Sequence, residues 1–103
     1  MYDEVVVYVD PDLEELIPMF IENRYTDIDE INRLITIGNF SEVQRLGHSM
    51  KGSGGGYGFD EITNIGSEME LAAKRGDRIE LERLNERLTS YLSAVKIVYD
   101  DIK

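Results

Sequence analysis

The chain has 103 residues, 42% of them hydrophobic, which is enough for one folded domain with a modest core and too little for two. It has no cysteine and a single histidine, His48, which excludes a disulfide scaffold, a thiolate metal site and a site with several histidine ligands. Eleven Lys and Arg against 21 Asp and Glu give a formal net charge of −10, so we expect neither nucleic acid nor an anionic membrane as a partner.

Nothing in the sequence predicts a membrane segment or a secretory leader. No apolar run approaches the roughly 20 residues that a transmembrane helix needs. The first residues, Met1 to Glu4, lack the basic stretch of a signal peptide. We therefore expect a cytoplasmic protein that folds as one domain over residues 1–103.

The first part of the chain predicts a lead-in followed by a helix. A β-branched run opens the sequence, but no second strand-like run is evident for it to pair with, so we expect an extended or irregular lead-in over residues 1–9 that packs on the rest of the chain. Asp10 followed by Pro11 has the pattern of a helix start and predicts a first helix over residues 10–25. Pro18 lies inside that apolar pattern and should kink the helix.

Four further helices are predicted by capping residues and helical apolar spacing. Each predicted range begins at or directly after a residue whose side chain can accept a hydrogen bond from the backbone of the first turn. Gly38 and Gly76 are predicted to end two of these helices, as glycine does at many helix C-termini. The predicted helices cover residues 27–37, 41–57, 60–75 and 77–102, with Thr26, Ser41, Asp60 and Asp77 as their caps.

The last predicted helix has the clearest periodicity. Its apolar residues alternate spacings of three and four, which is a heptad pattern: Leu81, Leu84, Leu88, Tyr91, Val95, Val98 and Ile102. A helix packed within its own bundle is the favoured interpretation, and we expect a monomer, with a dimeric coiled coil as the alternative. Because the connections are short, we predict an all-α fold: an up-and-down antiparallel four-helix bundle with an additional N-terminal helix.

Two catalytic patterns are disfavoured by their spacing. The run from Gly52 to Gly58 contains no G-x-G-x-x-G register, and Lys51 precedes the glycines instead of following them as in a phosphate-binding loop. A Ser–His–acid triad would need a strand–turn–helix elbow, which the sequence lacks. We therefore expect no nucleotide site, no cofactor and no metal in this chain.

His48 is predicted to face solvent. At about 100° per residue, His48 lies about 140° from Val43, on the side opposite the apolar arc of its helix. Lys51 and Gly52 follow three and four residues later and neighbour His48 in the next turn, and Gly55 extends the same face. Glycine costs a helix up to about 1 kcal/mol relative to alanine. Clearance for the active site of a second macromolecule is a good reason to accept that cost.

The chemistry of this pattern fits a carrier of phosphoryl groups. An exposed imidazole is largely neutral near pH 7 and is then a competent nucleophile without a general base. It can accept a phosphoryl group in line and return it, while Lys51 beside it offsets the charge of the phosphoryl oxygens. The remaining apparatus, such as Mg²⁺, would belong to the partner.

The glycine-rich run carries a family resemblance. Residues 48–59, HSMKGSGGGYGF, resemble the signature of histidine phosphotransfer (HPt) domains: H-x-x-K-G, then small residues, an aromatic or aliphatic residue and glycine. The likeness covers roughly residues 10–103 and continues downstream through Ile62, Ile65, Gly66, Met69, Glu70, Ala72, Ala73, Gly76 and Asp77.

The resemblance implies a function and roles for residues. His48 would take a phosphoryl group from a receiver-domain aspartate or a histidine kinase and pass it to another receiver aspartate. Lys51 would lie beside the phosphoryl group, and Gly52 would give the receiver room to dock. Gly58 would allow close helix packing. The receiver would hold the Mg²⁺.

Other charged residues are weaker candidates. Glu70 is at an offset where a chemotaxis-kinase branch of the family carries a Glu that holds one ring nitrogen and leaves the other nucleophilic; a solvated surface Glu is the alternative. Lys74 lies one turn beyond Glu70 and could join a basic rim with Arg45, Lys51 and Arg75. For Arg45 and Arg75, scattered surface charge is the simpler interpretation.

Two other functions remain open from the sequence. One is a helical adaptor that binds receivers without being phosphorylated, although it would need neither His48 nor Lys51. The other is the phosphoacceptor module of a chemotaxis-type kinase, which Glu70 and the run from Gly56 to Phe59 slightly favour.

Overall fold

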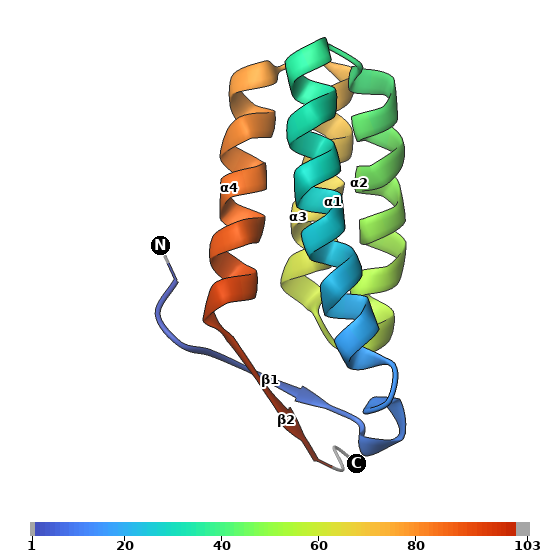
Figure 1. Ribbon diagram of the computed structural model, residues 1–103, viewed down its shortest axis with the longest axis vertical. Coiled ribbons are helices and arrows are strands. Elements are labelled where there is room, and N and C mark those ends of the chain that lie inside the picture. The colour runs from blue at the N-terminus through green and yellow to red at the C-terminus, as the bar shows by residue number, and fades with distance from the viewer. Residues whose placement is uncertain (1, 101–103) are drawn as a thin grey trace.

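The computed structural model describes residues 2–100, and this part of the chain forms a bundle of four α-helices. Successive helices run in opposite directions, so the bundle is antiparallel (Figure 1). None of these helices combines the length and apolar character needed to cross a membrane. The helices are α1 (Ile17–Ile37), α2 (Phe40–Gly54), α3 (Asp60–Lys74) and α4 (Arg78–Ala94).

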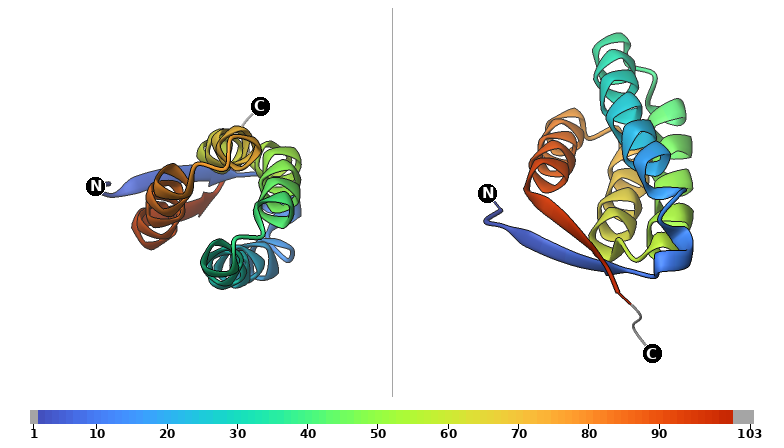
Figure 2. Two further views of the ribbon diagram at one scale, coloured as in Figure 1. Left: turned by 90° about the horizontal axis from the view of Figure 1, so that it is seen from above. Right: turned by 60° about the horizontal axis from the view of Figure 1, so that its bottom comes forward.

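Each helix buries one apolar face in a shared core. Seen from above, the four helices surround that core, and α2 packs most extensively against α3 (Figure 2). The predicted heptad stripe of the last helix is buried over three of its leucines, which supports its packing within the bundle. The largest fully buried side chains include Phe59, Ile31, Leu34, Met50, Ile62, Ile65, Met69, Leu81, Leu84 and Leu88.

The N-terminal helices differ from the prediction. Helices were expected over residues 10–25 and 27–37, but α1 is continuous through this boundary. Thr26 caps nothing; its hydroxyl donates to the carbonyl of Glu22, 3.3 Å away, within the helix. Pro18 falls in the first turn of α1, where a missing N–H removes no helical hydrogen bond, so it starts the helix instead of kinking it.

The predicted additional N-terminal helix is not confirmed. Between Asp10 and the start of α1 the structure has a single short 3-10 turn, Pro11–Leu13, in place of a helix. Asp10 does cap this turn as expected, because its carboxylate accepts from the backbone N–H of Asp12 at 2.9 Å.

The two ends of the chain pair with each other, which the sequence analysis did not foresee. β1 (Val5–Val9) and β2 (Val95–Tyr99) form a parallel two-stranded sheet, with Val5 opposite Val95 and Val9 opposite Tyr99. The predictions that the N-terminal segment has no strand to pair with and that a helix extends over 77–102 are therefore wrong, whereas the expected extended segment packed on the rest of the chain is observed. The last helix ends at Ala94, and the predicted positions 101 and 102 lie outside the described residues.

This β1–β2 ribbon lies across the end of the bundle where α1 begins and α4 ends (Figures 1 and 2). Val7 and Val9 of β1 are buried against the bundle. A β-branched sequence such as residues 95–99 suits a strand as well as it suits a heptad stripe, and the partner strand 90 residues away decides between them.

The caps were predicted with mixed success. Asp77 caps α4 as predicted, since its carboxylate accepts from the N–H of Glu80 at 3.1 Å. For α2 the cap is Asn39 and not Ser41, and Asp60 is the first residue of α3, one position inside its expected place. Gly38 ends α1 in a left-handed conformation with φ of 76°, as predicted for a helix terminus.

Candidate functional site

His48 lies on the exposed face of α2. Its side chain is 71% exposed, and the buried positions of the same helix are Val43, Gly47, Met50 and Gly54. The helical-wheel prediction that this imidazole faces solvent is therefore confirmed. The ring is accessible to a macromolecular partner without any movement of the bundle.

Glu70 of α3 joins His48 to Lys51. One oxygen of its carboxylate, Oε2, lies 3.1 Å from Nδ1 of His48, and the other, Oε1, lies 3.9 Å from Nζ of Lys51. The Glu70 side chain is only 16% exposed, whereas that of Lys51 is 49% exposed. The structure thus brings together three residues that the sequence singled out separately.

The contact between His48 and Glu70 defines the state of the ring. An ionised carboxylate only accepts hydrogen bonds, so Nδ1 of a neutral His48 carries the ring proton and donates a hydrogen bond to Glu70. The lone pair then lies on Nε2, the ring nitrogen that Glu70 leaves free. A fixed tautomer of this kind presents one defined nucleophilic atom to solvent.

Glycines bring α2 and α3 close enough for this contact. A Cβ atom at Gly66 would lie 2.6 Å from both the carbonyl oxygen of Gly47 and the backbone nitrogen of Lys51. A Cβ at Gly47 would lie 2.9 Å from the backbone nitrogen of Glu70 itself. The two backbones therefore touch directly beneath the site. Gly47 was not predicted as part of the site; its signal in the sequence is a small residue on the apolar face of its helix.

The end of the glycine-rich run is also explained by packing. A Cβ at Gly54 would lie 2.8 Å from the backbone nitrogen of Thr63, so Gly54 is the close-packing glycine here. Gly58, to which the resemblance gave that role, instead adopts φ of 90° in the turn before α3. Thr63 also binds α2 directly, because its hydroxyl donates a hydrogen bond to the backbone carbonyl of Lys51 at 3.2 Å.

Two glycines flank the site on its open side. A Cβ at Gly52 would meet nothing within 4 Å, and one at Gly55 would meet only the Thr63 hydroxyl oxygen, at 3.5 Å. Both residues are exposed. Packing therefore gives no reason for a glycine at position 52, whereas clearance for a partner does.

The basic residues near the site are distributed unevenly. Lys74 is exposed at the last position of α3, one turn beyond Glu70. Arg75 lies 3.7 Å from the carboxylate of Asp77. Arg45 forms an ion pair with Glu42, one turn earlier on its own helix. Of these four basic residues, Lys51 forms the ion pair with Glu70.

An open hollow lies directly beside the imidazole. It spans the surfaces of α2 and α3 and is lined by Ser41, Gln44, Arg45, His48 and Glu70. The hollow is where a group attached to the exposed ring would have room.

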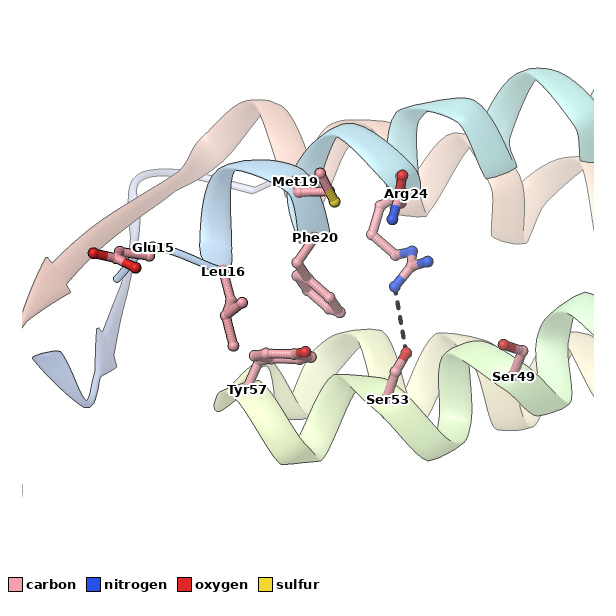
Figure 3. A pocket seen from close by; sticks show the side chains of 9 residues that line it. Glu15, Leu16, Met19, Phe20, Arg24, Ser49, Ser53 and Tyr57 are labelled. Carbon is pink, nitrogen blue, oxygen red and sulfur yellow. Dashed lines mark hydrogen bonds between the residues drawn. The ribbon is translucent and has the colours of Figure 1, made fainter. Parts of the chain in front are cut away.

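A second hollow lies between α1 and α2, and the sequence analysis did not identify it. The side chains of Leu16, Phe20 and Tyr57 gather at one end, and Arg24 donates to the hydroxyl of Ser53 at 3.3 Å at the other (Figure 3). It is lined by Glu15, Leu16, Met19, Phe20, Asn23, Arg24, Ser49, Ser53 and Tyr57. This hollow shares no lining residue with the one beside His48.

The fold and the site define a helical bundle that presents one histidine, backed by a carboxylate and an ammonium group, to solvent. The family model of the Hpt domain matches residues 15–97, most of the chain, so the chain belongs to the Hpt domain family. Hpt domains are phosphocarrier modules of two-component signalling that interact with receiver domains and histidine kinases. No curated protein and no solved structure gives a significant match.

Proposed function

We propose that this chain carries a phosphoryl group on Nε2 of His48 in a phosphorelay. It accepts the group from a receiver-domain aspartate or from a histidine kinase, and passes it to another receiver aspartate. The observation that carries the proposal is the 3.1 Å contact between Nδ1 of His48 and Glu70, made by a ring that is 71% exposed. A ring held at one nitrogen and open at the other suits reversible phosphorylation.

The transfer step needs no general base, because Nε2 of the neutral ring carries no proton. The Nε2 lone pair forms the N–P bond while the P–O bond to the donor aspartate breaks, and the aspartate leaves as a carboxylate. The proton on Nδ1 stays in place, and the ring becomes a cation. Glu70, already beside Nδ1, stabilises that cation and acts as a positioning residue for the ring. The reverse sequence returns the phosphoryl group to a receiver.

Lys51 and the bare glycines complete the proposed site. The Lys51 ammonium is one helical turn from His48 and offsets the negative charge of the phosphoryl oxygens. Gly52 and Gly55 leave room for the docked receiver, which supplies the Mg²⁺, and Lys74 adds positive charge on that side. We propose that the chain acts as a monomer in the cytoplasm, where it would meet its receivers.

Phosphoryl uptake from a panel of radiolabelled, phosphorylated receivers tests the proposal. The wild-type chain is expected to become labelled, and the label should be labile in acid and stable in base, as phosphohistidine is. The His48→Gln variant should keep the helical circular dichroism of the wild type and lose uptake completely.

Ser49→Ala is the matched control, because Ser49 is the adjacent exposed hydroxyl on α2. It should be labelled like the wild type. Labelling of H48Q, or loss of labelling in S49A with His48 intact, contradicts the proposal. Receiver binding without any labelling would instead support the adaptor function.

A further inference from the structure

Arg45 is the Lys or Arg residue among those that line the hollow beside His48. It precedes His48 by three residues on α2, as Lys51 follows it by three, so a cation lies one turn away on each side of the imidazole. Lys51 faces Glu70, whereas Arg45 lines the hollow together with Ser41, Gln44, His48 and Glu70.

Phosphorylation of His48 adds negative charge that Lys51 alone does not neutralise. A phosphoryl group brings between one and two negative charges near neutral pH. Lys51 already lies 3.9 Å from the Glu70 carboxylate, so these two residues together contribute no net charge. The chain as a whole has a formal charge of −10, which adds a repulsive background.

Arg45 is held by an interaction that it can give up. Its Nε lies 3.0 Å from Oε1 of Glu42, and its Nη2 lies 2.9 Å from Oε2, but the Arg45 side chain is 63% exposed. Exposed ion pairs of this kind contribute little to stability. A doubly charged phosphoryl group is a stronger partner for a guanidinium fork than one carboxylate is.

We propose that Arg45 is the phosphoryl clamp of this carrier: on phosphorylation of His48, its guanidinium leaves Glu42 and binds the phosphoryl oxygens in the hollow. This inference rests on the proposed function, since it needs phosphohistidine at position 48. It assigns Arg45 a binding role for the phosphorylated state, whereas the unphosphorylated chain keeps Arg45 on Glu42.

The chain contains a matched control for this proposal. Arg33 and Glu30 form the same kind of pair three residues apart on α1, with side chains 59% and 43% exposed, against 63% and 43% for Arg45 and Glu42. Arg33→Gln therefore removes an equivalent ion pair without removing a residue of the hollow beside His48.

The test prepares phosphohistidine chemically with phosphoramidate, so it needs no receiver. In the wild type, the ¹⁵N–¹H resonance of the Arg45 side-chain Nε should move on phosphorylation, and that of Arg33 should not. The pH midpoint of the ³¹P resonance, which reports the second ionisation of the phosphoryl group, should be higher in Arg45→Gln than in the wild type and in R33Q.

The expected shift corresponds to about a threefold change in proton affinity, the size of an exposed charge interaction, and should shrink in high salt. The charged neighbours are Glu42, which pairs with Arg45, Glu70, which lines the hollow and pairs with Lys51, and Asp27 of α1, which has a weaker influence on Arg45; all four are unchanged in every variant. Arg45→Lys keeps a positive charge, so its ³¹P midpoint should lie between those of the wild type and R45Q.

Equal ³¹P midpoints in R45Q and the wild type, or an Arg45 resonance that does not respond, overturn the clamp. If phosphoramidate labels His48 with the expected Arg45 response but no receiver transfers to it, the proposed relay fails while the clamp stands. If no phosphohistidine forms at all, both are overturned.

Discussion

Gly66 lies where α3 contacts α2, and Gly52 lies on the exposed surface of α2; the two illustrate different reasons for a glycine. At Gly66 a Cβ would lie 2.6 Å from backbone atoms of α2, a distance that real Cβ atoms essentially never show. At Gly52 a Cβ would lie in open space. The first glycine sets the helix separation that lets Glu70 reach His48, and the second has no structural purpose within the chain.

We predict that alanine at these two positions has opposite effects on stability. Gly66→Ala should lower the free energy of unfolding by roughly 1–3 kcal/mol, because the new methyl group forces the helices apart. Gly52→Ala should raise it by up to about 1 kcal/mol, because alanine is the better residue in an exposed helix. Urea denaturation followed by circular dichroism measures both. A destabilising G52A would mean that position 52 is packed in solution.

At the residue scale, the features that depend on a single helix could be predicted from the sequence. The exposure of His48 and the place of Lys51 beside it follow from helical periodicity alone. The contact between His48 and Glu70 joins two helices, and the sequence suggested it only through a family resemblance. The supporting pair of Gly47 and Gly66 depends on how the helices meet, which the periodicity of either helix does not contain.

Among the elements, the helices of the bundle were predictable and the ends of the chain were not. α2, α3 and most of α4 carry the expected apolar stripes over nearly the expected ranges. The β1–β2 ribbon was missed because a strand needs a partner, and the partner of residues 5–9 lay within a heptad pattern that also suits a helix. Local pattern could not decide between these two structures; pairing between the chain ends did.

The ribbon should contribute to stability through the face that it buries. Val9 is 1% exposed and Val6 is 41% exposed, in the same strand. Val9→Ala should lower the free energy of unfolding by about 2 kcal/mol, from two buried carbon atoms and the cavity they leave. Val6→Ala is the control and should change it by less than about 0.5 kcal/mol. Equal effects in urea titrations of the two variants would show that the ribbon is not packed on the bundle.

On the scale of the whole molecule, one polar cluster links the N-terminal segment to two helices. The hydroxyl of Tyr2 donates to the carboxylate of Glu61 on α3, and Arg87 of α4 lies 3.0 Å from the same carboxylate oxygen. Arg87 also reaches Glu68 at 2.7 Å, and the ring of Tyr2 packs edge-on against Tyr91. The cluster therefore attaches the N-terminal segment to α3 and α4.

This cluster predicts a pH dependence of stability. Burial alone would raise the pKa of Glu61, but hydrogen bonds from Tyr2 and Arg87 outweigh it and hold the pKa below its usual range. Because the folded pKa lies below the unfolded one, the stabilisation is complete above the unfolded value of about 4.3 and is lost as the pH falls through the folded value. The free energy of unfolding should therefore decline as the solution is acidified past that point.

Arg87→Gln isolates the contribution of this cluster. It removes the cation that lowers the pKa of Glu61, so the variant should be less stable at pH 7 and should lose less of its remaining stability between pH 5 and about pH 3 than the wild type does. Lys74→Gln removes one exposed positive charge elsewhere on the bundle and should keep the wild-type slope, which separates the local effect from the change in net charge. Urea titrations at a series of pH values give the slopes. If R87Q and K74Q lose stability equally on acidification, Glu61 is not held by Arg87 in solution.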